Sequence, residues 1–205
     1  MPQFSPEEKQ RIERALIEEG TRLFTEKGLK NTTVDNLTAR VQIAKGTFYH
    51  FFENKEALFF RCMEAHEALI EERELNPIFA NASDPEAMLA DLLRFSADLP
   101  AAYPFFRVAS EPETLLHLRK RLPEEIWNEH FRRDLEDTDR FYRRWAEQGL
   151  ECRLDASTFN GVFRALIMMS FQRREIGETV YPAVMDLMIR ALARELIRWF
   201  DKKER

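Results

Sequence analysis

The sequence predicts an all-α protein of about nine helices, and three observations support this. Apolar residues recur at spacings of three and four along nearly the whole chain, which is the period of a helix with one buried face. Only 6 of the 205 residues are glycine, and Gly28, Gly149 and Gly177 each lie where a helical pattern stops, as C-terminal helix caps do. No alternating apolar run with an Asn-Gly or Asp-Gly turn indicates a β-hairpin.

The first third of the chain predicts helices over residues 5–27, 32–41, 45–51 and 54–75. The first contains Gly20, which weakens a helix by about 1 kcal/mol relative to alanine, so we expect tertiary packing to hold it. Thr32 is a candidate N-cap for the second helix, with Asp35 three residues later as a weak capping box. Asn54 is a good N-cap for the fourth.

In the remaining two-thirds of the chain, prolines are frequent at first and the predicted helices are interrupted. Six of the nine prolines lie between residues 77 and 123, where they limit helices to about 84–99 and 102–121, with an irregularity near Pro112. Longer patterns follow over about 123–147, 155–175 and 179–201. We expect the helix over 54–75 to link the two parts of the chain.

Charge and composition exclude several classes of protein. A formal net charge of −5 argues against binding of polyanions by bulk charge, yet residues 27–50 alone carry a local charge of +3. No apolar run is long enough to span a membrane and no secretory signal is visible, so we expect a cytoplasmic protein. Cys62 and Cys152 leave a disulfide open, but the composition favours reduced thiols.

Residues 32–55 have the spacing of a helix-turn-helix, because two short helices separated by about three residues follow a longer one. The outward polar positions of the second short helix can reach base edges and phosphates, and its glycine allows a close approach of the backbone. Helix N-termini near Thr33 and Lys55 are suited to phosphate. Any three-helix unit shows a similar pattern, so spacing alone leaves DNA binding open. The outward positions are Lys45, Gly46, Thr47, Tyr49 and His50.

The segment AKGTFYHFFENKEALF at 44–59, with LFTEKG at 23–28 and TTV at 32–34, resembles the signature of TetR-family transcriptional regulators. The resemblance covers about residues 10–60. It implies an all-α homodimer with a DNA-binding domain over 1–53 and a ligand-binding and dimerisation domain over 54–205. It also implies a pseudo-palindromic operator and repression relieved by a small molecule. By position, Thr33, Tyr49 and Lys55 would contact phosphates, and Lys45, Gly46, Thr47 and His50 would face the major groove.

Several positions depart from the family pattern. Gln42 stands where glycine is usual, and we expect a conformational cost if that residue is left-handed. Ala44 replaces the usual serine and cannot cap the third helix with its side chain. Phe51 replaces tyrosine or histidine, and Glu19 and Gly20 replace a small apolar pair. These changes bear on the identity of the operator more than on the activity.

The last two predicted helices are apolar on more than one face. One chain covers one face of each helix, so the other face requires a ligand pocket or a second copy of the chain. We expect an isologous four-helix bundle, although both faces could be internal core. The expected interface residues are Phe159, Leu166, Leu187, Ala191 and Leu196.

Aromatic residues are abundant in the proline-broken region and the helix that follows. Short helices around a long one can leave a cavity, and aromatic walls suit an apolar or flat effector, although such residues are more often ordinary core. The candidate pocket residues are Phe95, Tyr103, Phe106, Trp127, Phe131 and Phe163.

Nothing in the sequence indicates an enzyme, a metal site or a cofactor. The four histidines have no metal-ligand spacing, and we interpret the pair Glu113 and His117 as a solvated surface pair. There is no glycine-rich phosphate loop and no serine or cysteine in a nucleophile setting. The alternative to a DNA-binding regulator is a helical ligand-binding or adaptor module that keeps the three-helix unit as a scaffold.

Overall fold

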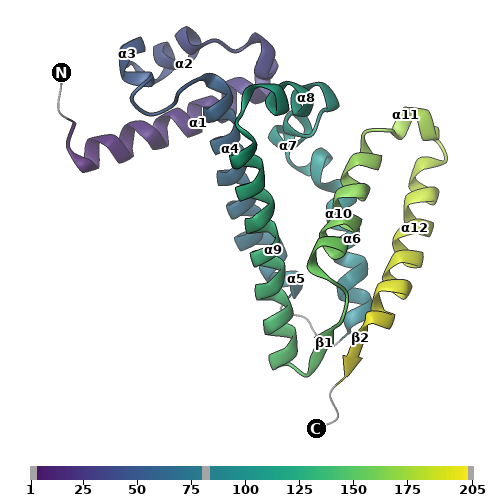
Figure 1. The fold of residues 1–205 in the computed structure, drawn as a ribbon. Helices are drawn as coiled ribbons and strands as arrows, with labels where there is room; N and C mark the ends of the chain where they lie inside the picture. Colours follow the sequence, from purple (N-terminus) through teal and green to yellow (C-terminus); the bar gives the residue numbers. More distant parts are fainter. Residues whose placement is uncertain (1–3, 80–83, 203–205) are drawn as a thin grey trace. The chain divides into compact units, whose positions relative to one another are not determined.

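The computed structural model of the chain describes residues 4–79 and 84–202, and the described chain is almost entirely helical, as predicted (Figure 1). Its packing divides into two compact units. Unit 1 contains Met1–Leu69 and Tyr103–Pro123, and unit 2 contains Ile70–Ala102 and Glu124–Arg205. No helix within the described ranges is long and apolar enough to cross a membrane.

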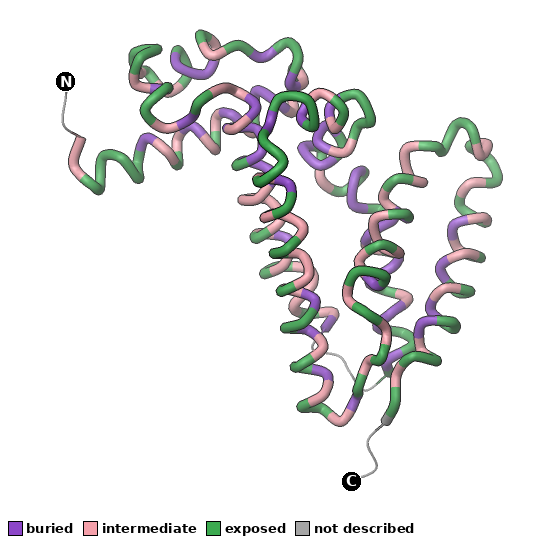
Figure 2. Tube along the Cα trace, in the orientation of Figure 1, coloured by how far each residue is buried: buried purple, intermediate pink, exposed green. Residues whose placement is uncertain are grey.

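Unit 1 is built around a small aromatic and aliphatic core. Phe24 and Phe59 meet edge to face with ring centroids 4.9 Å apart, and the ring centroid of Phe105 lies 5.1 Å from that of Phe59. Figure 2 shows α1 with a buried stripe beneath α2 and α3. Burial of such rings is the main favourable term that holds these short helices together. The elements are α1 (Pro6–Asn31), α2 (Val34–Val41), α3 (Lys45–Phe48), α4 (Lys55–Ile70), α7 (Pro104–Ala109) and α8 (Pro112–Arg121).

The junction of α1 and α2 differs from the prediction in one respect. The N-cap of α2 is Thr33, whose hydroxyl accepts from the backbone N–H of Asn36 while the Asn36 side chain accepts from Thr33. The prediction that Thr32 is the N-cap is wrong. Thr32 is fully buried and donates its hydroxyl to the carbonyl of Gly28 at 2.9 Å. Gly28 itself has a φ of +75° and kinks the helix, which resumes beyond it, so α1 extends to Asn31.

In the turn between α2 and α3, the two residues that depart from the family pattern have the conformations and contacts expected of them. Gln42 is left-handed, with φ 57° and ψ 45°, and Ala44 caps α3 without any side-chain hydrogen bond. The third helix is shorter than the predicted 45–51 and ends at Phe48, beyond which His50 and Phe51 donate to carbonyls three residues back, as in a 3₁₀ turn.

Gly20 is explained by the packing of α1 on α4. A Cβ at this position would lie 3.1 Å from Leu58 Cδ2 and 3.3 Å from Cys62 Sγ. Tertiary packing therefore offsets the low helix propensity of glycine, as predicted. The Cys62 thiol is buried here, and burial raises its pKa to about 12.

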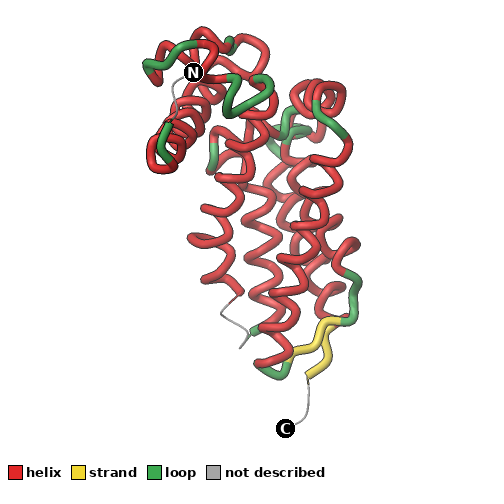
Figure 3. The backbone as a smooth tube through the Cα atoms, turned by 60° about the vertical axis from the view of Figure 1, so that its left-hand side comes forward, coloured by secondary structure: helices red, strands yellow, loops and turns green. Residues whose placement is uncertain are grey.

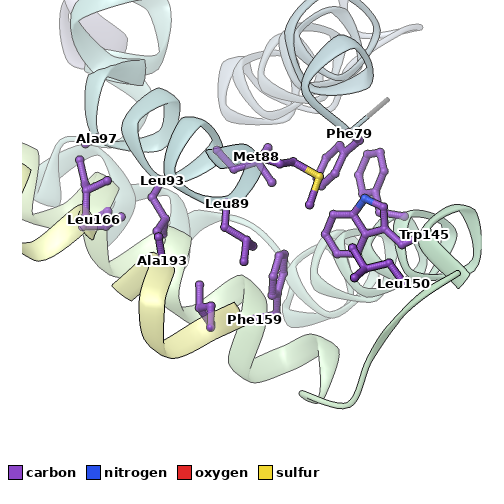
Figure 4. Close-up of a cluster of buried hydrophobic side chains, with 14 of the residues drawn as sticks. Phe79, Met88, Leu89, Leu93, Ala97, Trp145, Leu150, Phe159, Leu166 and Ala193 are labelled. Atoms are coloured by element: carbon purple, nitrogen blue, oxygen red, sulfur yellow. The ribbon is translucent and has the colours of Figure 1, made fainter. Parts of the chain in front are cut away.

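Unit 2 places α6 against both α10 and α12, around a core that contains Trp145, Phe159 and Leu166 (Figure 4). Trp145 is fully buried and lies beside Phe79 and Leu150. The elements are η1 (Glu71–Leu75, a π-helix), α5 (Asn76–Phe79), α6 (Pro85–Ala102), α9 (Glu124–Glu147), β1 (Leu150–Cys152), α10 (Ala156–Ser170), α11 (Arg173–Ile176), α12 (Tyr181–Leu196), η2 (Ile197–Trp199, a 3₁₀-helix) and β2 (Phe200–Lys202).

Several predicted helices are subdivided. Pro104 and Pro112 each begin a helix, so the predicted 102–121 becomes α7 and α8, and the last two predicted helices end early at α10 and α12. The prediction of about nine helices is approximate for this reason. The chain also forms a short antiparallel strand pair that local patterns do not predict, with Leu150 opposite Lys202 and Cys152 opposite Phe200 (Figure 3).

Candidate nucleic-acid interface

The outward positions of the helix-turn-helix form one exposed surface of unit 1. Lys45, Tyr49 and His50 are exposed, with Tyr49 at 52%, while Thr47 is half-buried at their centre. Phe48 is fully buried beneath them, and its ring meets that of Tyr49 edge to face at 5.4 Å. The buried Phe48 therefore anchors α3 and supports the Tyr49 ring. This packing fixes the geometry of the exposed face that a partner would contact.

Gly46 lies on this surface with open space above its Cα. A Cβ built there meets no atom of the chain within 4 Å, and its backbone is helical. Packing and backbone conformation within the chain therefore give no reason for glycine at this position. Close approach of another molecule's backbone or base edges would give one.

Thr33 is exposed at the start of α2 and uses its side chain as the helix cap. The first-turn amides of α2 give this end a partial positive charge, which is the usual setting for phosphate at a helix end.

Lys45 is paired on this surface with Asp35 of α2. Its ammonium lies 2.9 Å from one carboxylate oxygen and donates to the other at 3.2 Å. The hydrogen bond to Asp35 raises the pKa of Lys45, so the lysine stays charged. Any contact of Lys45 with phosphate or guanine must compete with, or be shared by, the Asp35 carboxylate.

Lys55, for which a phosphate contact stays a prediction, is held by backbone carbonyls of its own chain. Its ammonium donates to the carbonyls of Leu29 and Thr32 at 2.7 Å each and to that of Lys30 at 3.2 Å. Burial lowers the pKa of Lys55, the neighbouring Glu56 opposes that shift, and Arg121 adds to it. The ammonium thus joins the start of α4 to the junction of α1 and α2.

Glu56 and His117 form a contact that sequence reasoning missed. His117 Nε2 lies 2.8 Å from Glu56 Oε1, and the Glu56 side chain is only 9% exposed. The sequence pattern pairs His117 with Glu113 on its own helix. His117 instead joins α8 to α4 across 61 positions, and no local signal in the sequence could have shown this.

The five expected dimer residues separate into two groups. Phe159, Leu166 and Leu196 are at most 5% exposed and belong to the core of unit 2. Leu187 is 63% exposed and Ala191 is also exposed, on the outer side of α12. The interface stays a prediction, and within one chain only these last two residues are available to carry it.

The six expected pocket residues do not lie in one unit. Tyr103 and Phe106 belong to unit 1, where Phe106 lies 6.3 Å from His66. The other four, Phe95, Trp127, Phe131 and Phe163, belong to unit 2.

Within unit 2 a polar cluster adjoins Phe131. The Arg164 guanidinium lies 4.9 Å from the centre of that ring and 3.9 Å from the Asp134 carboxylate. Burial raises the pKa of Asp134 to about 6, with Arg164 opposing the shift. Thr138 and Asn160 complete the cluster through a 2.7 Å hydrogen bond. No group of three or more potential metal ligands occurs among residues 4–79 and 84–202.

The two-helix element falls within a known family model. Residues 16–62 match the model of the bacterial regulatory proteins of the tetR family. Over these residues the chain is similar to the TetR-family regulators. Curated TetR-type relatives include the transcriptional repressor DhaR of Mycobacterium sp. (strain GP1), 41% identical over 46 residues, and the negative regulator IcaR of Staphylococcus epidermidis, 35% identical over 49 residues.

These matches cover 22% and 24% of this chain, and the chain spans about a quarter of the length of either relative. A longer match, to the transcriptional regulator AcuR of Cereibacter sphaeroides, is 32% identical over 94 residues, or 45% of this chain and 42% of AcuR.

Solved TetR-type structures share the fold over nearly the whole chain. A TetR-family regulator from Pectobacterium atrosepticum has a TM-score of 0.61 at 21% identity, covering 98% of this chain and 100% of the other. The fatty acid degradation regulator FadR of Bacillus halodurans has a TM-score of 0.56 at 16% identity, covering 94% and 96%. The likeness in fold therefore extends beyond residues 16–62 to nearly the whole chain.

Proposed function

We propose that the chain is a sequence-specific transcriptional regulator, most simply a repressor, that binds operator DNA as a homodimer and is released by a small-molecule ligand. One observation carries the proposal. The segment that matches the TetR-family model contains a helix-turn-helix whose outward side chains are exposed together, around a glycine that the fold itself does not require. Such a regulator acts in the cytoplasm and needs neither enzymatic activity nor a cofactor.

The residues proposed to contact DNA divide into those that bind base edges and those that bind the phosphate backbone of the DNA. Thr47 and His50, with Lys45 and the bare backbone of Gly46, would enter the major groove, where hydroxyl, imidazole and ammonium groups can bond base edges. Tyr49 and the N-terminus of α2 at Thr33 would hold phosphates, which fix position without selecting sequence.

The dimer would use the outer face of α12 and the adjoining face of α10. Leu187 of α12 and Met168 of α10 are 63% and 59% exposed, and both helices pack on α6. Pairing these helices with their two-fold mates would bury them and set two recognition helices about 34 Å apart, one turn of a pseudo-palindromic operator.

The ligand would bind in the C-terminal part of the chain, which we delimit as residues 54–205, behind a DNA-binding domain over residues 1–53. One structural relative, FadR of Bacillus subtilis, was solved with stearoyl-CoA, and another, AibR, with isovaleryl-CoA and operator DNA. The aromatic residues Trp127, Phe131 and Phe163 in unit 2 support an apolar or flat effector for this chain. Release requires that the ligand bind the DNA-free form more tightly than the DNA-bound form.

The test is selection of bound duplexes from a random pool, followed by binding measurements over a range of salt concentrations. We expect a pseudo-palindromic consensus and a steep negative slope of log K against log salt. Tyr49→Ala should weaken binding to all duplexes alike, whereas Thr47→Ala should change the preferred bases. Retention of no duplex by the purified protein would refute the proposal and favour a ligand-binding or adaptor module.

A further inference from the structure

The C-terminal end of α8 carries three consecutive basic residues, Arg119, Lys120 and Arg121, all of them exposed. No ion pair is formed by Lys120 or Arg121 with the acidic residues of the described ranges. Unit 2 differs, since Arg132, Arg140 and most of its other arginines have acidic partners within 4 Å. Basic residues favour helix C-termini in general, so their position within unit 1 decides what they could bind.

The hydrogen bond between Glu56 and His117 fixes that position. It holds α8 against the first turn of α4, which Figure 1 shows near the end of α1. Lys120 and Arg121 follow His117 by three and four residues, so they lie on the same side of α8, about one turn further along. The end of α8 therefore lies next to Lys55, the residue that joins α4 to the junction of α1 and α2.

Further cations lie at this junction. Lys27 and Lys30 are exposed in the last turns of α1, and neither forms an ion pair with a described acidic residue. Arg121 is close enough to lower the pKa of Lys55, whereas the acid of this turn, Glu56, is buried against His117. We call Lys27, Lys30, Lys120 and Arg121 the basic edge.

The basic edge is continuous with the proposed DNA interface. Lys55 donates to the carbonyl of Thr32, and the next residue, Thr33, caps the helix end that we assign to a phosphate. Exposed lysine and arginine side chains without acidic partners neutralise phosphates and release counterions. Continuity with a phosphate-binding helix end favours DNA over an acidic protein as the occupant.

We propose that Lys120 and Arg121 of α8 contact the phosphate backbone of the operator outside the helix-turn-helix. The inference rests on the proposed function and extends it. Residues from the C-terminal two-thirds of the sequence would then lengthen the DNA contact of each protomer, adding affinity without adding sequence preference.

The test uses the full chain, one duplex obtained by selection and a random-sequence duplex of the same length. Lys120→Gln/Arg121→Gln removes two phosphate contacts from each protomer of the dimer, and each contact contributes about 0.9, so the slope of log K against log salt should fall by about 3.6. Binding at 0.1 M salt should weaken by at least about tenfold for both duplexes, and the hydroxyl-radical footprint should shorten at its outer edges.

The matched control is Arg107→Gln, which removes an exposed cation from α7 in the same unit. It should leave the slope and the footprint unchanged, and all variants should retain the thermal transition of the parent chain. A parent-like slope and footprint in the double variant, with normal binding by the parent, would overturn this inference alone. If the parent chain bound no duplex, the proposed function would fail and this inference with it.

Discussion

Replacement of Lys55 by methionine tests whether its ammonium serves the fold or the DNA. Methionine keeps much of the aliphatic stem but removes all three donors, leaving the carbonyls of Leu29, Lys30 and Thr32 without this partner. Leu29 and Thr32 are 3% and 0% exposed, so water cannot readily replace the ammonium there, whereas the more exposed Lys30 carbonyl can be hydrated.

The magnitude follows from these three acceptors. A buried acceptor that loses its partner costs about 1–3 kcal/mol, and loss of a cation at a helix C-terminus costs a further ~0.3–1 kcal/mol. Methionine also removes the desolvation penalty that lowers the pKa of Lys55, which offsets part of this loss. We therefore expect Lys55→Met to destabilise unit 1 by about 2–4 kcal/mol.

The assay combines urea unfolding of the full chain with native-state hydrogen exchange, because two units need not unfold together. Amides near residues 29–36 should exchange faster in Lys55→Met by the factor that this free energy implies. Lys30→Met, which removes a neighbouring exposed cation, should change stability by less than about 0.5 kcal/mol. A variant of Lys55 with parent-like stability and exchange, but with weakened DNA binding, would refute our reasoning and restore the direct phosphate contact.

Three further predictions follow from single contacts. Asp35→Asn should release Lys45, strengthen binding to random duplexes and steepen the salt dependence by about one phosphate contact per protomer, or about two per dimer, measured by fluorescence anisotropy. Asp134→Asn should stabilise the chain by about 1–2 kcal/mol at pH 8, after allowance for its one-third exposure. The folded-state pKa of about 6 lies above the ordinary 3.8, so this gain should shrink as the pH falls from 6 towards 4 in urea titrations. Leu187→Asp should halve the mass in light scattering while leaving the thermal transition of the monomer intact.

Each prediction has a matched control and an outcome that would contradict it. Glu18→Gln removes another exposed acid of unit 1, and an equal gain in DNA affinity would mean that Asp35 acts only through net charge. Asp139→Asn removes an exposed acid of the same helix, and the same pH profile as Asp134→Asn would exclude burial as the cause. The control for Leu187→Asp is Leu116→Asp, which changes a leucine that is 57% exposed in unit 1. An unchanged mass for Leu187→Asp would place the interface elsewhere.

Local sequence patterns predicted the fold class and the turn chemistry of unit 1. Gln42 adopts the left-handed turn expected from its position, and Gly20 packs against α4 as the weak helix propensity implied. The error at Thr32 arose because two adjacent threonines both suit an N-cap. The choice between them depends on the carbonyls of Leu23 and Gly28, which lie in the preceding helix and cannot be read from a window around residue 32.

Contacts between distant segments could not be predicted in the same way. Glu56 and His117 are separated by 61 residues, and the two strands meet across about fifty, so no periodicity within either segment signals its partner. Amphipathic patterns have a related ambiguity. Phe159 and Leu166 lie on an apolar face that a second chain could cover, but α6 of the same chain covers it, and periodicity does not distinguish the two.

The composition of unit 1 has a consequence for synthesis on the ribosome. Phe105 lies on Phe59 and 4.7 Å from His66, but it is made long after residue 69, and the unit is complete only at Pro123. At about 5–20 residues per second, the 40 residues from Leu69 to the end of α7 at Ala109 take about 2–8 s to synthesise. During that interval α7 does not yet cover the aromatic face of α4. The nascent chain therefore exposes apolar surface to which chaperones or another nascent chain could bind.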